Sequence, residues 1–429
     1  MNDRNDLRIC IVAENASVKM GGEAIIPYHY FRVLRSRNLD AWLIVHERTR
    51  KELEALFPQE LERIRFIPDK LLQKIFYRLG LALPHRVAEA TFGLANQLLT
   101  QLTQRSATRS LVTDRCVVHQ PIPVSPRFPS LLWDMSAPVV VGPMNGGMDY
   151  PPAFRSAESA LSRIAIAAGR SFTNGVNALL PGKLRAAIVL VANQRTREAL
   201  PSGITGRVLE LCENGVDLSQ WVAPGDAPMA SHTASGFLFV GRLVDWKALD
   251  IVLEAMQRVP DANLDVIGDG PMLVPWRKLA IDQGLADRVH FHGWLPQSEC
   301  ARYLATARAL LLPSLYECGG AVVLEAMAMS KPVIATAWGG PADYLNESCG
   351  ILVEPASRDA MIAGFAEAMQ RLIASPGLAE QLGNAGRTRL LEHFDWEKKV
   401  DAMLEVYESM LPVPDVAAAT GRAPETARV

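Results

Sequence analysis

The chain has 429 residues, with 44 Lys plus Arg against 46 Asp plus Glu and a formal net charge of −2. A chain of this length is expected to form roughly two to three domains. Apolar residues make up 49% and charged residues 21%, which is typical of a globular protein with a large core. The near-zero charge argues against a general nucleic-acid binder, although a local basic patch stays open.

Membrane and redox signals are weak along the whole chain. No run of about 18 apolar residues predicts a spanning helix, and the polar start Met1–Cys10 lacks the basic-then-apolar plan of a signal peptide. The six cysteines are scattered without a Cys-x-x-Cys pair, which favours reduced thiols over a disulfide or zinc framework. These features together predict a cytoplasmic enzyme.

Short apolar runs, rich in Val and Ile, alternate with helical patterns. Strands buried on both faces of a parallel sheet have this continuous apolar character. The first series of predicted strands covers 7–13, 41–45, 116–119, 139–142 and 187–191. The second covers 236–240, 264–267, 289–292, 309–313 and 332–335, and helices are predicted over 25–36, 248–258 and 272–283. Two β-α series in succession predict an α/β protein with two doubly wound, Rossmann-like domains.

The domain boundaries follow from composition. A Pro- and Ser-containing stretch over 223–235 predicts a linker between an N-terminal domain (1–222) and a C-terminal domain (236–395). Apolar residues recur at helical spacing from Trp396 to Met410, which predicts a closing helix over 396–411 with one face against a core. The Pro-, Ala- and Thr-rich end, 412–429, is expected to be a disordered tail.

Two glutamates mark the first candidate site. A predicted strand ends at Pro313, and Glu317, Gly319 and Gly320 follow before a helix that carries Glu325. Ligands of open α/β sheets bind beyond the carboxyl ends of the strands, where glycines allow close approach and a helix start offers free N–H groups. The alternative is an acidic residue that merely favours the helix dipole.

Two cations follow another predicted strand. Arg242 comes directly after Gly241, and Lys247 lies five residues further on. Both side chains are suited to a diphosphate, because charge-assisted contacts to phosphate are the strong kind. The alternative is a pair of solvated surface cations.

With these motifs in place, the sequence resembles the family-4 retaining glycosyltransferases of the GT-B fold. The resemblance covers nearly the whole chain and rests on Gly241-Arg242-Leu243 with Lys247, Gly268-Asp269-Gly270-Pro271, and the two glutamates eight residues apart. It implies two domains facing a deep cleft, with a C-terminal helix that crosses back to the N-terminal domain. It also implies that Arg242 and Lys247 bind the donor diphosphate, Glu317 contacts the transferred sugar, and Glu325 holds the ribose.

Some positions depart from the family pattern. The family usually has a bulky aromatic residue where Gly319 stands and a larger aliphatic residue at Ala321, and Asp343 replaces a common glutamate. We expect these departures to open space near the sugar.

The N-terminal half carries weaker signals. Gly21 and Gly22 precede the helix over 25–36, His119 ends a strand, and Asn145 and Gly146 lie in a glycine-rich strand exit. By resemblance, the glycine pair lies beside the phosphates and acceptor, and His119 lies near the reacting sugar as a catalytic residue with Glu317. Asn145 and Gly146 are expected on the acceptor side. A plain turn, a structural histidine and an ordinary loop are the respective alternatives.

The predicted reaction moves a hexose from a UDP- or GDP-linked sugar to a saccharide hydroxyl with retention. No Asp-x-Asp motif stands at a strand end, so we expect no metal, and no cofactor besides the nucleotide sugar. The resemblance implies polysaccharide, exopolysaccharide or envelope glycan synthesis, with a lipid-linked acceptor. A sugar-nucleotide epimerase and a non-catalytic sugar-nucleotide-binding protein are the alternatives.

The stretch Lys70–Arg105 predicts a surface element of another kind. Lys70, Lys74, Arg78 and Arg86 are interleaved with leucine, isoleucine and phenylalanine. Such an amphipathic pattern is suited to peripheral contact with anionic lipid on the cytoplasmic face of the membrane. A helix packed on the sheet is the alternative.

Overall fold

The structure is a computed structural model that describes residues 6–20, 22–80, 92–155, 172–221 and 236–411. The predicted linker over 223–235 and the predicted tail over 412–429 lie outside the described residues. Gly21 and Arg86 also lie outside them.

The N-terminal domain is built on a parallel sheet of seven strands in the order β3-β2-β1-β4-β5-β6-β7. The middle strands are buried on both faces, which explains their continuous apolar sequences. The strands are β1 (Arg8–Val12), β2 (Asp40–His46), β3 (Ile64–Ile67), β4 (Cys116–Gln120), β5 (Val139–Met144), β6 (Ile188–Val191) and β7 (Arg207–Glu210).

The C-terminal domain is built on a second parallel sheet, with six strands in the order β10-β9-β8-β11-β12-β13. Its strands are β8 (Phe237–Val240), β9 (Leu264–Ile267), β10 (Val289–Gly293), β11 (Leu310–Leu312), β12 (Val333–Thr336) and β13 (Gly350–Val353). The chain order reverses beside β8 in this sheet and beside β1 in the first sheet. Two doubly wound domains are therefore confirmed, and ligands of such sheets bind at these reversal points.

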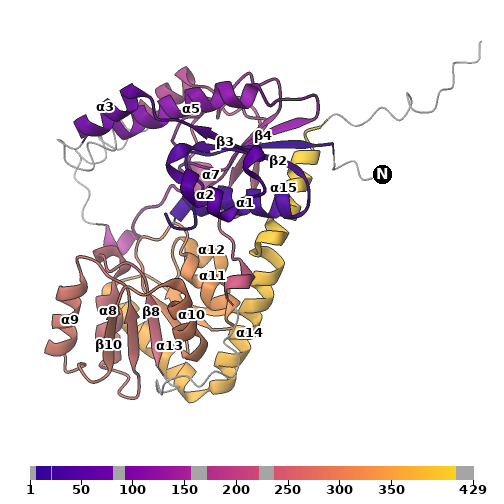
Figure 1. The fold of residues 1–429 in the computed structure, drawn as a ribbon. Coiled ribbons are helices and arrows are strands. Elements are labelled where there is room, and N and C mark those ends of the chain that lie inside the picture. Colours follow the sequence, from indigo (N-terminus) through magenta and orange to yellow (C-terminus); the bar gives the residue numbers. More distant parts are fainter. Residues whose placement is uncertain (1–5, 21, 81–91, 156–171, 222–235, 412–429) are drawn as a thin grey trace, which may run out of the picture.

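Helices surround both sheets. Among the described residues of the N-terminal domain they are α1 (Ile25–Ser36), α2 (Arg50–Leu56), α3 (Leu71–Gly80), α5 (Leu94–Arg109) and α7 (Gln194–Glu198). In the C-terminal domain they are α8 (Leu249–Met256), α9 (Leu273–Asp282), α10 (Gln297–Thr306), α11 (Ala321–Ala328), α12 (Gly340–Tyr344), α13 (Arg358–Ala374) and α14 (Pro376–His393). Figure 1 shows α3 and α5 on the side of the N-terminal domain away from the C-terminal domain.

The last helix, α15 (Trp396–Glu408), returns to the N-terminal domain (Figure 1). Trp396, Val400 and Tyr407 are buried in the core formed by α1 and the N-terminal sheet. Arg37 at the end of α1 fixes the helix from outside, with ion pairs of 2.7 Å to both Glu397 and Asp401. A helix at the end of the chain thus ties the two domains together.

Within the described ranges, no helix is long and apolar enough to cross a membrane. The same residues contain no group of three or more His, Cys, Asp or Glu side chains that could hold a metal ion.

Candidate functional site

Lys247 and Glu317 meet at the carboxyl ends of β8 and β11, which are neighbours in the C-terminal sheet. The ammonium group of Lys247 forms an ion pair with the carboxylate of Glu317. The two side chains keep 13% and 16% of their surface exposed, so the pair is largely but not fully buried. The structure therefore brings together two of the predicted donor-binding residues.

Arg242 lies on the same strand exit and is exposed. Its guanidinium carbon lies 5.6 Å from the centre of the Trp246 ring, which is within cation–π range. Among the residues that the structure describes, no ion pair of Arg242 is found. Its charge is thus available to an anion beside the Lys247–Glu317 pair.

The two glycines after Glu317 have different structural roles. Gly320 adopts a left-handed conformation (φ 85°) just before α11. This conformation favours glycine, because residues with a side chain are strained in it. Gly319 is enclosed by other parts of the chain, since a Cβ atom built on it would lie 2.4 Å from Nδ2 of Asn214. The expectation that Gly319 opens space is therefore wrong, because Asn214 and Tyr344 fill that space.

Glu325 lies in α11, the helix that follows this loop, and is partly buried. Burial raises the pKa of its carboxyl group to about 7, and a hydrogen bond from Gln297 opposes that shift. A carboxyl group that titrates near neutrality accepts hydroxyl hydrogen bonds best in its ionised form.

Asn145, just after β5, faces the C-terminal domain. Its amide nitrogen donates one hydrogen bond to the carboxylate of Glu213 (2.6 Å) and another to the backbone carbonyl of Cys318 (2.8 Å). Asn214 also donates to the same Glu213 oxygen (2.9 Å) and to the hydroxyl of Tyr344 (2.8 Å). We call Asn145, Glu213, Asn214, Tyr344 and the Cys318 carbonyl the interdomain polar cluster.

A second contact between the domains lies next to this cluster. Asp343 of α12 accepts a hydrogen bond from Asn193 (2.8 Å) and pairs with Arg195 of α7 (3.1 Å). Where the resemblance implies a deep cleft, loops of the two domains thus touch directly.

His119 is completely buried in the N-terminal domain. Its Nε2 lies 2.6 Å from the carbonyl oxygen of Gly142, and its Nδ1 lies 2.7 Å from the hydroxyl of Tyr407 in α15. A carbonyl only accepts, so Nε2 carries the proton and Nδ1 accepts from Tyr407. Burial lowers the pKa of His119 to about 4, and the bond to Gly142 opposes that shift. The ring does not face a cleft, in contrast to the expectation from its strand-end position.

The glycine turn near the N-terminus is only partly described. Gly22 adopts φ 53° and has open space around it, whereas Gly21 lies outside the described residues. The next residue, Glu23, accepts a hydrogen bond from the backbone N–H of Val124 (2.7 Å), and the carbonyl of Val124 accepts one from the N–H of Asn145 (2.9 Å). The turn therefore lies in the same neighbourhood as Asn145.

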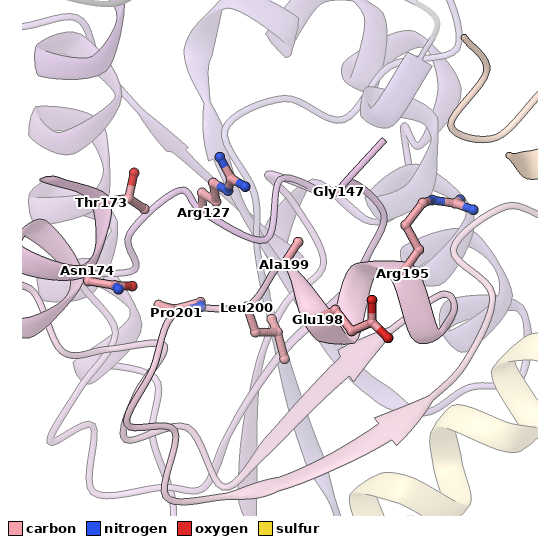
Figure 2. A pocket seen from close by; sticks show the side chains of 9 residues that line it. All are labelled: Arg127, Gly147, Thr173, Asn174, Arg195, Glu198, Ala199, Leu200 and Pro201. Atoms are coloured by element: carbon pink, nitrogen blue, oxygen red, sulfur yellow. The ribbon is translucent and has the colours of Figure 1, made fainter. Parts of the chain in front are cut away.

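Gly146 is tied to α7. Its N–H donates to the hydroxyl of Thr196 (3.1 Å), and that hydroxyl donates to the Gly146 carbonyl (3.2 Å). The residues around it line a pocket of about 320 Å³ on the N-terminal domain. Figure 2 shows its lining from several segments: Arg127, Gly147, Thr173, Asn174, Arg195, Glu198, Ala199, Leu200 and Pro201.

Sequence reasoning missed the residues that join the domains. Glu213, Asn214, Asn193 and Arg195 were not among the predicted site residues. Each is an ordinary polar residue after a strand, so nothing in its local pattern marks it. Glu213 carried the one available signal, because a carboxyl group beside an apolar strand usually needs a partner.

Comparison with known proteins shows the fold, and a family model matches part of the chain. Anabaena Alr3699/HepE, solved in complex with UDP, superposes with a TM-score of 0.62 over 94% of this chain and 100% of that chain, at 14% identity. The fold is GT-B. Residues 230–389 match the family model of the group 1 glycosyl transferases.

Two curated relatives align with about half of the chain. The lipopolysaccharide core biosynthesis glycosyltransferase LpsE of Rhizobium meliloti is 31% identical over 206 residues, which are 48% of this chain and 55% of that protein. A GDP-mannose-dependent phosphatidylinositol monomannoside mannosyltransferase of Mycolicibacterium smegmatis is 28% identical over 238 residues, 51% of this chain and 61% of that protein. The chain spans a little over half the length of these relatives.

Proposed function

We propose that the protein is a retaining glycosyltransferase that moves a hexose from a nucleotide diphosphate sugar to a saccharide hydroxyl. The observation that carries the proposal is the Lys247–Glu317 pair at adjoining strand ends, with the exposed cation Arg242 on the same strand exit. Two cations and one carboxylate are suited to a ligand that joins a diphosphate to a polyhydroxylated ring.

Different residues bind different parts of the donor. Arg242 and Lys247 neutralise the diphosphate and stabilise the charge that develops on it as the bond from the anomeric carbon breaks. Glu317 accepts hydrogen bonds from the sugar hydroxyls, and Glu325 accepts them from the ribose. Gly320 lets the ligand approach the backbone. Because side-chain cations supply the countercharge, transfer proceeds without a metal or a further cofactor, and it should persist in EDTA.

Retention follows if both steps occur on one face of the sugar. The bond between the anomeric carbon and the diphosphate oxygen breaks, and a bond from that carbon to the acceptor oxygen forms on the same side. The proton of the acceptor hydroxyl moves to the departing phosphate oxygen, so no protein base is required.

The comparisons support two candidate nucleotides. The solved neighbour binds UDP, and one relative depends on GDP-mannose. The relative from Rhizobium acts in lipopolysaccharide core synthesis, which supports a role in the synthesis of envelope or extracellular polysaccharide. The pocket of Figure 2, on the N-terminal domain, is the proposed place for part of the acceptor.

We further propose that α3 contacts an anionic membrane surface and brings the enzyme to a lipid-linked acceptor. Leu71, Leu72, Ile75 and Leu79 are 76%, 45%, 43% and 49% exposed. Lys70, Lys74 and Arg78 are exposed beside them, and apolar residues flanked by cations favour the lipid interface. Arg105, at the other end of the predicted element, instead donates to the carbonyl of Trp133 (2.9 Å), so the proposed contact is confined to α3.

The proposed activity is tested by incubating the wild-type protein with UDP- and GDP-linked hexoses and a panel of saccharide acceptors. Release of the nucleoside diphosphate that depends on acceptor, with a product of unchanged anomeric configuration by NMR, is the expected result. Conversion of the donor without acceptor to an epimer would contradict the proposal.

A further inference from the structure

The loop between β11 and α11 (residues 313–320), which we call the donor loop, is held in part by the N-terminal domain. The amide nitrogen of Asn145 has two hydrogens, and both are used: one for Glu213 and one for the Cys318 carbonyl. Because both neighbours are acceptors, only the nitrogen of the amide fits this position. Cys318 follows Glu317 directly, so Asn145 is one peptide unit away from the proposed sugar-contacting carboxylate.

Glu213 completes the attachment from the segment that leads out of the N-terminal domain. Its carboxylate accepts from Asn145 and Asn214 at once, and Asn214 packs against Gly319 so closely that no Cβ atom fits there. Asn145 and Glu213 are only 6% and 4% exposed, so water does not replace these bonds cheaply.

We propose that Asn145 is a positioning residue of the transferase, which sets the place of Glu317 by holding the donor loop from the opposite domain through Glu213 and Cys318. The inference rests on the proposed function. It assigns Asn145 to the donor side, whereas its sequence position predicted an acceptor-side loop. Donor geometry then depends on how the two domains meet, so the donor loop is fully placed only when they are in contact.

The first variant is Asn145→Ala, which removes both of these hydrogen bonds and also the longer one (3.5 Å) that Asn193 donates to the side-chain oxygen of Asn145. Displacement of a reacting group by about 1 Å costs on the order of 100-fold in rate, so we expect kcat to fall about 10- to 100-fold. Binding of the nucleoside diphosphate should change less than threefold, because Arg242 and Lys247 are untouched. A kcat within twofold of the wild type would overturn the inference.

The second variant, Asn145→Asp, tests the hydrogen bonds themselves. It places a second carboxyl group 2.6 Å from the Glu213 oxygen, and two carboxylates so close share a proton. The shared proton restores only the bond to Glu213, and the Cys318 carbonyl regains a donor only when a second proton binds. We therefore expect kcat to recover in part as the pH falls, whereas Asn145→Ala stays slow at every pH. A pH profile parallel to that of the wild type would contradict the inference.

The charged and titratable groups around Glu213 come from several elements, and all of them enter this pH dependence. Burial raises the pKa of Glu213, while the hydrogen bond from Asn145 and the nearby Lys399 of α15 oppose the shift. The other groups are Asp343 and Tyr344 of α12, Cys318 of the donor loop, Tyr30 of α1 and the neighbouring Cys212. Each is present in wild type and variant alike, so the difference between their profiles reports on position 145.

A matched control is Trp338→Phe. It removes another hydrogen bond between the domains, from the indole N–H to the carbonyl of Asp149 (2.8 Å), without touching Asn145 or Glu213. We expect its kcat and pH profile to match the wild type. A loss equal to that of Asn145→Ala would show that any interdomain bond matters, and would overturn the specific role of Asn145.

A readout independent of turnover separates this inference from the proposed function. Hydrogen–deuterium exchange of a peptide covering residues 315–322 should be at least about tenfold faster in Asn145→Ala and unchanged in Trp338→Phe. If the wild type transfers no sugar but exchange responds in this way, the proposed function fails and the attachment of the loop stands. Unchanged exchange in Asn145→Ala overturns the attachment, whatever the activity.

Discussion

Lys247 and Glu317 follow strands of the C-terminal sheet and stay 13% and 16% exposed, whereas His119 and Asn145 stand at strand ends of the N-terminal sheet and are 0% and 6% exposed. In the C-terminal domain, the two charged groups form an ion pair with each other at the end of the sheet. Either group can give up that ion pair to bind a ligand. In the N-terminal domain, both side chains are committed to other parts of the same chain. A polar residue at a strand end is therefore expected to make a polar contact. Whether it is available to a ligand depends on whether other parts of the chain already occupy its hydrogen-bonding groups.

The largest expected effect belongs to the Lys247–Glu317 pair. Lys247→Ala and Glu317→Ala should each lower turnover by at least about 100-fold, since removal of one preorganised electrostatic contact costs on that order. The double variant should lose far less than the product of the two, because the residues act on each other. Steady-state kinetics measures all three. Lys278→Ala, which breaks an exposed ion pair with Asp282 in α9, is the control. Near-normal turnover in both single variants would contradict the assignment of the donor site to the C-terminal domain.

The buried histidine should affect stability more than chemistry. Tyr407→Phe removes the hydroxyl that donates to Nδ1 of His119 and leaves that nitrogen buried without a partner. The free energy of unfolding should fall by about 1–3 kcal/mol, measured by denaturant titration, with kcat nearly unchanged. Tyr316→Phe, on an exposed ring, should change it by less than about 0.5 kcal/mol. A large fall in kcat for Tyr407→Phe with normal stability would instead support a catalytic role for His119.

The pH dependence of stability follows from the same residue. The folded pKa of His119, about 4, lies below its ordinary value of 6.5, so folding favours the neutral ring. The contribution of the neutral His119 ring to the free energy of unfolding is complete above pH 6.5. It is lost as the pH falls from 6.5 towards 4.

Glu325 is expected to have a smaller effect on the pH dependence of stability, and in the opposite direction. Its folded pKa of about 7 lies above the ordinary 4.5, so the stability of the ligand-free protein from this group declines as the pH rises from 4.5 through 7. Nucleotide affinity should rise over the upper part of that range, by about fivefold between pH 6 and pH 7, because the ribose needs the ionised acceptor. Calorimetric titration at several pH values measures this. Glu325→Gln should bind more weakly and show a flatter profile. An equally steep profile in that variant would assign the dependence to another group.

The smallest effect on the folded protein is expected on α3. Ile75→Asp and Leu79→Asp change exposed side chains, so the free energy of unfolding should shift by no more than about 0.5 kcal/mol. Sedimentation with vesicles that contain anionic lipid should nevertheless fall several-fold. Leu391→Asp, an exposed leucine on α14, is the matched control. Equal sedimentation of wild type and variants would contradict membrane contact through α3.

The sequence predicted the buried strands well and the outer strands poorly. β3, β7 and β13 were missed, and each lies at an edge of its sheet. β3 and β7 mix polar with apolar residues, as in Arg207–Glu210, whereas β13 is apolar but only four residues long. When an apolar run is very short or is interrupted by polar residues, periodicity does not identify it as a strand.

The same division holds for the candidate site. Glu317, Gly320 and Glu325 lie within nine residues on one strand-loop-helix unit, so their spacing alone carries a pattern. Asn145 and Cys318 are 173 positions apart, and their contact depends on how two whole domains meet. No local signal encodes it, and the occupation of the space beside Gly319 by Asn214 was hidden for the same reason.

The most direct test of the account is calorimetric titration of UDP and of GDP into the wild type and Lys247→Ala, with Lys278→Ala as the control. The account predicts that at least one of the two nucleotides binds the wild type and the control at one site per chain. In Lys247→Ala, the affinity for that nucleotide should be at least about tenfold weaker, which corresponds to 1.4 kcal/mol. Equal affinity in all three proteins, or no binding of either nucleotide, would contradict the central claim that the ends of β8 and β11 hold the donor diphosphate.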